Sequence, residues 1–209
     1  MGKVETIITA LEQMYPYATC ELHHRNALEL LVAVMLSAQT TDAMVNRVTP
    51  TLFKKYQTAD AYLRVPVSAL EQDLKRIGLY RNKAKNLHAM MRQLVDHHEG
   101  QVPEDQAALE ALPGVGRKTA NVVLSVWFNH PRIAVDTHVK RVAKRLKLAF
   151  LKDDVWAIEQ KLMRKFPKDT WSKLHHQMIF FGRYHCKASA PKCEGCPLKS
   201  ECRFPNIHV

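Results

Sequence analysis

Four cysteines near the end of the chain are spaced as ligands of a metal centre. Cys186, Cys193, Cys196 and Cys202 follow the pattern C-x6-C-x2-C-x5-C, and Cys20 is the one further cysteine in the 209 residues. Two-plus-two zinc sites usually contain two close C-x-x-C pairs, whereas this segment has one. One close pair with two more distant thiols on a short segment favours a [4Fe–4S] cluster, with zinc second and a disulfide pair third.

The stretch LPGVGRKTA at Leu112–Ala120 has the composition of a phosphate-binding turn between two helices. Gly114 and Gly116 can take positive φ and let the backbone approach a ligand closely. A helix that starts near Lys118 presents unpaired N–H groups and a positive dipole end, and both favour phosphate. An ordinary helix–helix turn with a glycine C-cap is the alternative. With Arg117 in a basic chain, we predict a helix–hairpin–helix that binds DNA backbone without reading sequence.

Lys118 and Asp136 are candidates for covalent chemistry. Asp136 follows Lys118 by 18 residues, in IAVDTHV, and taken alone it is a good N-cap for a helix at Thr137. A hairpin helix and a short return would bring Asp136 back beside Lys118. An unprotonated amine can attack an anomeric carbon, and the neighbouring Arg117 and helix N-terminus favour that form. The carboxylate would stabilise positive charge on the sugar as its base leaves and would assist proton transfer.

Charge and composition limit the partners of this chain. It has 31 Lys and Arg against 20 Asp and Glu, a formal net charge of +11, which favours polyanions, with nucleic acid first and an anionic membrane surface second. The sequence contains no apolar run of the length that spans a membrane, about 18 residues, and no secretory signal at its N-terminus. We therefore expect a cytoplasmic protein without a membrane partner.

The elements that position these residues are predicted to be helices, because apolar residues recur at helical spacing and no alternating strand pattern is present. Gly78–Ala84 and Gly114–Ala120 are similar short segments, each between two helices. We expect an all-α fold with Cys20 buried as an apolar filler. The expected helices cover about residues 4–15, 27–36, 42–56, 67–76, 82–98, 105–111, 118–128, 137–148, 153–166 and 170–184.

Together these motifs resemble the endonuclease III family of base-excision repair DNA glycosylases. The resemblance covers about residues 3–204 and includes LSAQTTD at 36–42 and IGLY at 77–80. It implies the helix-hairpin-helix DNA glycosylase fold, two helical domains with a DNA-binding cleft between them. The implied domains are a six-helix domain at 20–130, with the helix-hairpin-helix at about 105–129, and an iron–sulfur domain that joins 1–19 to 131–209 around the cluster loop 186–202.

The resemblance also implies an activity on duplex DNA that contains oxidised pyrimidines or abasic sites. The damaged base is flipped out of the duplex. Lys118 then attacks the anomeric carbon, the base leaves, a Schiff base forms, and β-elimination cuts the strand. With Asp136 as its partner, Lys118 would make the protein a bifunctional glycosylase and lyase. We expect it to work as a monomer, associated with the nucleoid.

Several further residues match family positions. Gln39 and Leu79 match positions that fill the gap left by the flipped nucleotide, where the plainer alternatives are a polar helix end and a core leucine. Glu110 and His138 match supporting residues near the active site. The [4Fe–4S] cluster is implied to be structural and to contact DNA, with phosphate contacts from two lysines of the cluster loop, Lys187 and Lys192.

Two rival functions make different predictions. The adenine-DNA glycosylase branch shares the fold, the cluster and the aspartate, but lacks a lysine at the hairpin position and has a further C-terminal domain. Lys118 and the length of 209 residues argue against it. A non-catalytic DNA-binding module would bind DNA tightly without cutting it, and Lys118 together with Asp136 argues against that as well.

Overall fold

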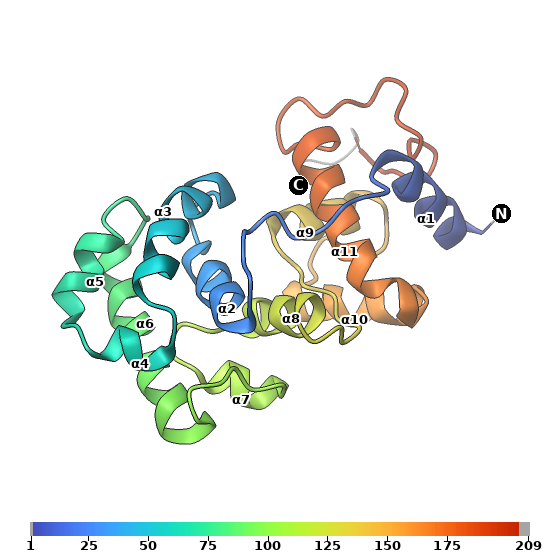
Figure 1. Ribbon diagram of the computed structural model, residues 1–209. Helices are drawn as coiled ribbons and strands as arrows, with labels where there is room; N and C mark the ends of the chain where they lie inside the picture. The colour runs from blue at the N-terminus through green and yellow to red at the C-terminus, as the bar shows by residue number, and fades with distance from the viewer. Residues whose placement is uncertain (1, 205–209) are drawn as a thin grey trace. The chain divides into compact units, whose positions relative to one another are not determined.

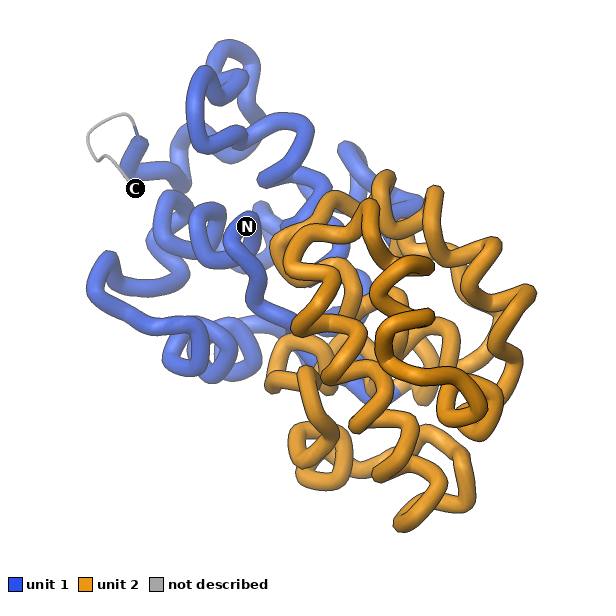
Figure 2. The backbone as a smooth tube through the Cα atoms, turned by 90° about the vertical axis from the view of Figure 1, so that its left-hand side faces the viewer, with its two compact units in different colours: residues 1–19, 130–209 blue, residues 20–129 orange. Residues whose placement is uncertain are grey.

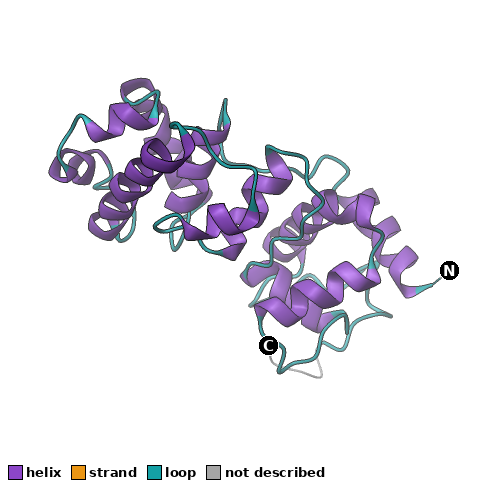
Figure 3. Cartoon of the chain, turned by 90° about the horizontal axis from the view of Figure 1, so that it is seen from below, coloured by secondary structure: helices purple, strands orange, loops and turns teal. Residues whose placement is uncertain are grey.

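The computed structural model describes residues 2–204, so residue 1 and residues 205–209 of the predicted iron–sulfur domain lie outside the described range. All regular elements in this range are helices (Figures 1 and 3), which confirms the all-α prediction. The chain divides into two compact units (Figure 2). Unit 1 joins residues 1–19 to 130–209, and unit 2 is residues 20–129. None of the described helices is long and apolar enough to cross a bilayer.

Unit 2 is built around a helix that is apolar on nearly all sides. This helix, α2, has buried side chains from Glu29 to Leu36, because the sequence ALELLVAVML offers no polar face to water. Asn26 caps it by accepting a hydrogen bond from the Glu29 N–H at 2.9 Å. The helices of unit 2 are α2 (Ala27–Leu36), α3 (Asp42–Lys55), α4 (Ala59–Leu63), α5 (Val67–Asp73), α6 (Tyr80–His98), α7 (Gln106–Ala111) and α8 (Arg117–Val126).

Helix α4 was not predicted from the sequence. It has five residues, too few for a helical period to repeat. The Thr58 hydroxyl caps it by accepting from the Ala61 N–H, and Ala59 and Tyr62 bury its inner face. This short helix packs against α6 and so adds to the core of unit 2.

Unit 1 packs α1 against the helices that follow α8 in the sequence. Its core contains aliphatic side chains that each contribute about 1.5–3 kcal/mol on burial, among them Ile7, Leu11, Val139, Val142, Leu162 and Met178. The elements are α1 (Lys3–Met14), α9 (Thr137–Arg145), α10 (Val155–Lys165), a 3₁₀ turn (Lys168–Thr170), α11 (Trp171–Phe180) and a π-helical turn (Phe181–His185). The π-helical turn continues α11 to the first cysteine of the cluster loop, and only its helical character was predicted.

Gly182 lets the π-helical turn approach α9 closely. A Cβ at this position would lie 2.9 Å from the Cβ of His138 and 3.2 Å from Cγ2 of Val142. The Gly182 carbonyl accepts a 2.6 Å hydrogen bond from Nη2 of Arg141, so the same residue also bonds the turn to α9. The absence of a side chain therefore fixes the spacing between α9 and the start of the cluster loop.

We predict that Gly182→Ala lowers the free energy of unfolding by about 1–3 kcal/mol, because the added methyl group overpacks this contact. Urea unfolding measures the change. Gln160→Ala, at a half-exposed position of α10, is the control and should stay within about 0.5 kcal/mol of the wild type. An unchanged unfolding midpoint for Gly182→Ala would contradict the close approach.

Candidate functional site

The hairpin between α7 and α8 contains one glycine on left-handed backbone, Gly114, and one on extended backbone, Gly116 with φ −101°. Gly114 has φ +79°, and a Cβ there would lie 3.0 Å from the Cβ of Asn86 on α6, so both conformation and space require glycine. Gly116 is the N-cap of α8, and nothing lies within 4 Å of the position its Cβ would take. The start of α8 is therefore open to a ligand, and its N-cap contributes no side-chain oxygen of its own.

Lys118 lies in the first turn of α8, where its side chain is exposed. Ala120, Val123 and Leu124 lie on the opposite face of α8 and are buried. Their packing fixes which face of the helix is exposed to solvent. The half-buried Arg117 places Nη1 3.4 Å from Oε1 of Glu110 on α7, and Gln106 donates to the same carboxylate oxygen. Glu110 therefore connects the two helices of the hairpin beside Lys118.

Gln39 and Leu79 both stand on left-handed backbone at exposed turns. Their φ angles are +53° and +58°, and Leu79 is 56% exposed, which rules out the alternative of a core leucine. The two turns touch at Gly78, where a Cβ would lie 3.0 Å from the carbonyl oxygen of Gln39 and 3.2 Å from Oγ1 of Thr40. Unit 2 thus brings the predicted gap-filling residues onto adjoining turns.

Asp136 is the N-cap of α9, as its sequence context predicts. Its Oδ1 accepts a 2.8 Å hydrogen bond from the Val139 N–H, and its side chain is half-buried. His138, also half-buried, has Nδ1 3.2 Å from Nη2 of Arg141. Lys118 belongs to unit 2 and Asp136 to unit 1, so their apposition stays a prediction.

Two arginines of α9 connect Asp136 and its helix to the cysteine segment. Arg141 donates to the carbonyls of Gly182 at 2.6 Å and Cys186 at 3.1 Å. Arg145 is 1% exposed and donates to Sγ of Cys186 at 3.3 Å and to the Lys187 carbonyl at 2.7 Å. Neither arginine was predicted as a site residue from the sequence. The only feature of the sequence that could have pointed to them is their i, i+4 spacing, which places both arginines on one face of the predicted helix.

Burial changes the acidity of two of the four C-terminal cysteines, Cys186 and Cys196. Burial raises the pKa of the Cys186 thiol, while the hydrogen bond and charge of Arg145 oppose this increase. Burial also raises the pKa of Cys196, and the charges of Cys186, Cys202 and Cys193 raise it further.

All five cysteines are free, so the structure does not support the disulfide alternative. Within residues 2–204, no group of three or more His, Cys, Asp or Glu side chains is arranged to hold a metal ion. Cys20 is half-buried, whereas the sequence predicted a fully buried apolar filler.

The segment between Cys186 and Cys193 is held at both ends and exposes two lysines. The Lys187 carbonyl accepts from Arg145, and the Lys192 N–H donates to the His185 carbonyl at 3.0 Å. Both lysine side chains are exposed. The backbone is thus fixed while both ammonium groups face solvent, as a contact to phosphate requires.

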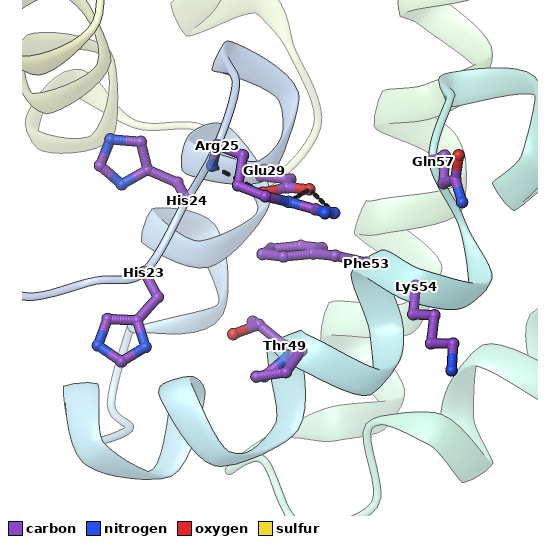
Figure 4. A pocket seen from close by; sticks show the side chains of 9 residues that line it. His23, His24, Arg25, Glu29, Thr49, Phe53, Lys54 and Gln57 are labelled. Carbon is purple, nitrogen blue, oxygen red and sulfur yellow. Dashed lines mark hydrogen bonds and ion pairs between the residues drawn. The ribbon is translucent and has the colours of Figure 1, made fainter.

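A cavity of about 400 Å³ lies elsewhere on unit 2, between the start of α2 and the end of α3 (Figure 4). Arg25 and Glu29, which form an ion pair at 2.6 Å, both line it. Phe53 and Lys54 of α3 also line it. None of the predicted site residues lines this cavity, and an open duplex-binding surface need not form an enclosed pocket.

A comparison with known protein families identifies the class of protein to which this chain belongs. Residues 32–168 match the family described as "HhH-GPD superfamily base excision DNA repair protein". The match spans the hairpin, Lys118 and Asp136.

Similarity over nearly the full length then defines the family. The chain is 57% identical over 203 residues to endonuclease III of Bacillus subtilis (strain 168), covering 97% of this chain and 93% of that protein. It is 46% identical over 198 residues to endonuclease III of Escherichia coli (strain K12), covering 95% and 93%. A solved "Trapped Endonuclease III-DNA Covalent Intermediate" superposes with a TM-score of 0.94 at 54% identity, covering 97% of this chain and 96% of that one. The chain belongs to the endonuclease III family.

Proposed function

We propose that this chain starts base-excision repair by removing oxidised pyrimidines from duplex DNA and then cleaving the abasic site. The observation that carries the proposal is the exposed amine of Lys118 in the first turn of α8, directly behind the open Gly114–Gly116 hairpin. A nucleophile at this place lies beside the phosphate-binding N-terminus. Membership of the endonuclease III family supports the same activity, that of a bifunctional DNA N-glycosylase and lyase.

The hairpin and the net charge of +11 would bind the DNA backbone. Gly116 and the first-turn amides of α8 would face a phosphate, and Arg117 would add charge beside it. Lys187 and Lys192 would contact phosphate from unit 1. These contacts carry no sequence information, which suits an enzyme that must find damage anywhere in a genome.

Gln39 and Leu79 are proposed to enter the duplex where the damaged nucleotide leaves it. Their exposure and their left-handed turns support this role, because both side chains project from the surface instead of packing into unit 2. A base that has left the stack exposes its sugar to attack, and the gap costs less when protein side chains fill it.

The chemistry assigned to the chain follows from the amine of Lys118. Its nitrogen forms a bond to the anomeric carbon, the N-glycosidic bond breaks, and the base leaves with a proton. Ring opening then gives a protonated Schiff base, and loss of a C2′ proton breaks the C3′–O bond on the 3′ side. Asp136 would stabilise the positive charge that develops on the sugar and assist the proton transfers. His138 and Glu110 would position their neighbours, Arg141 and Arg117.

The four cysteines are proposed to hold a [4Fe–4S] cluster. Donors to sulfur support the fit: Arg145 donates to Cys186, and the Phe204 N–H donates to Sγ of Cys202 at 3.3 Å. Such hydrogen bonds are a usual feature of protein iron–sulfur sites. When bound, the cluster would stabilise the segment that carries Lys187 and Lys192. We further propose that the protein acts as a monomer in the cytoplasm, associated with the nucleoid.

We predict that Lys118→Ala lowers strand scission by more than about 1,000-fold, because it removes the nucleophile. The wild type, mixed with duplex DNA containing an oxidised pyrimidine and borohydride, should give a covalent protein–DNA adduct that Lys118→Ala does not form. Lys75→Ala, an exposed lysine of unit 2, is the control and should form the adduct. Binding without scission by the wild type would support the non-catalytic module, and scission without an adduct would contradict the Schiff base.

We also predict that the purified protein is yellow-brown and contains about four iron atoms and four sulfides per chain. Cys196→Ser should lose most of both, because it removes one of the four ligands, whereas Cys20→Ser should keep them. Iron and acid-labile sulfide analysis measures the difference. Colourless protein that contains zinc after an iron-replete anaerobic preparation would contradict the cluster.

A further inference from the structure

Lys83 is a buried lysine of unit 2 whose ammonium group has a complete set of partners. It lies in the first turns of α6 and is 5% exposed. Its Nζ donates to the carbonyl of Leu36 at 2.8 Å, to the carbonyl of Ala38 at 2.6 Å and to Oγ1 of Thr40 at 2.9 Å. An ammonium group has three donors, so all of them are used.

The three acceptors belong to the segment that ends α2 and carries Gln39. The carbonyls at a helix C-terminus have no partner within the helix, and a cation is favoured there by the helix dipole. Lys83 bonds to residues on both sides of Gln39, at positions 38 and 40. These bonds restrain the left-handed turn that exposes the Gln39 side chain.

The same residue is joined to Leu79 through the backbone. The N–H of Lys83 donates to the Leu79 carbonyl at 3.1 Å, which is the first helical hydrogen bond of α6. Gly78 packs against the carbonyl of Gln39, so the two turns also touch directly. Lys83 thus connects the Gln39 turn, through its side chain, to the Leu79 turn, through its main chain.

We propose that Lys83 is a positioning residue that sets the separation of Gln39 and Leu79 so that both can enter the duplex together. The inference rests on the proposed gap-filling role of these two residues. Lys83 itself touches neither the sugar nor the base. Its contribution is to the step in which the damaged nucleotide leaves the stack, and the bond-breaking steps at Lys118 do not depend on it.

The test compares duplex and single-stranded substrates, because a single strand needs no extrusion. Lys83→Met keeps the length of the side chain and removes its donors. On duplex DNA containing an oxidised pyrimidine, its single-turnover excision rate should fall about 10- to 100-fold, the order expected for a misplacement of about 1 Å. The KM should change little compared with kcat.

Fluorescence of 2-aminopurine placed beside the lesion measures extrusion directly and should show that it is slower in Lys83→Met. Borohydride trapping of the same variant on a single-stranded abasic oligonucleotide should keep the wild-type rate.

Two further variants separate the effect of the Lys83 hydrogen bonds from the effects of lost charge and of misfolding. Lys85→Met removes the same charge from an exposed position of α6, and its rates should stay within about twofold of the wild type. Thr40→Val removes one acceptor and leaves Lys83 in place, so it should slow extrusion in the same direction by a smaller factor. It carries the test if Lys83→Met does not fold.

Equal loss on duplex and single-stranded substrates would overturn the inference, because it would indicate a general defect. Wild-type extrusion by both Lys83→Met and Thr40→Val would overturn it as well. A wild-type protein that forms no adduct would instead overturn the proposed function, so the two failures can be told apart.

Discussion

One interaction recurs at two segments of this protein, the end of α2 and the start of the cysteine segment: a buried or half-buried cation donates hydrogen bonds to backbone carbonyls. Lys83 does this for the end of α2, and Arg141 and Arg145 do it for the start of the cysteine segment. Segments of this kind carry carbonyls that no regular helix satisfies. A hydrogen bond to a charged group contributes about 1.5–3 kcal/mol, roughly twice a neutral one, and loss of a buried cation would leave several carbonyls without partners at once.

This arrangement separates the residues that hold the structure from the residues that we propose to act on DNA. Lys83 and Arg145 are buried and Arg141 is half-buried, whereas Gln39, Leu79 and Lys118 are exposed. Burial lowers the pKa of Lys83, which would favour a neutral amine, but all three of its donors are already engaged and it is 5% exposed. It is therefore poorly placed to reach a sugar. Lys118 has the opposite properties, exposure and a position at the open start of α8.

Prediction from the sequence succeeded where a single local pattern determines the outcome. The hairpin needs Gly114 for its positive φ, and Asp136 caps α9 through its own side chain, so both could be recognised from neighbouring residues. It failed where the outcome depends on residues far apart in the chain. Lys83 bonds to partners about 45 positions away. Its helical spacing from Leu87 and Met90 places it on the apolar face of α6, but that spacing does not reveal which distant carbonyls its ammonium group meets. The turn of Leu79 likewise became distinct from a core position only once the fold was known.

The chemistry proposed for this chain depends on a covalent bond between the amine of Lys118 and the anomeric carbon. The most direct measurement is to reduce the complex with borohydride, digest the protein and DNA, and locate the sugar-bearing lysine by mass spectrometry. We expect a single modified residue, Lys118, in the peptide that begins the α8 helix. Modification of another lysine, Lys83 above all, would contradict it.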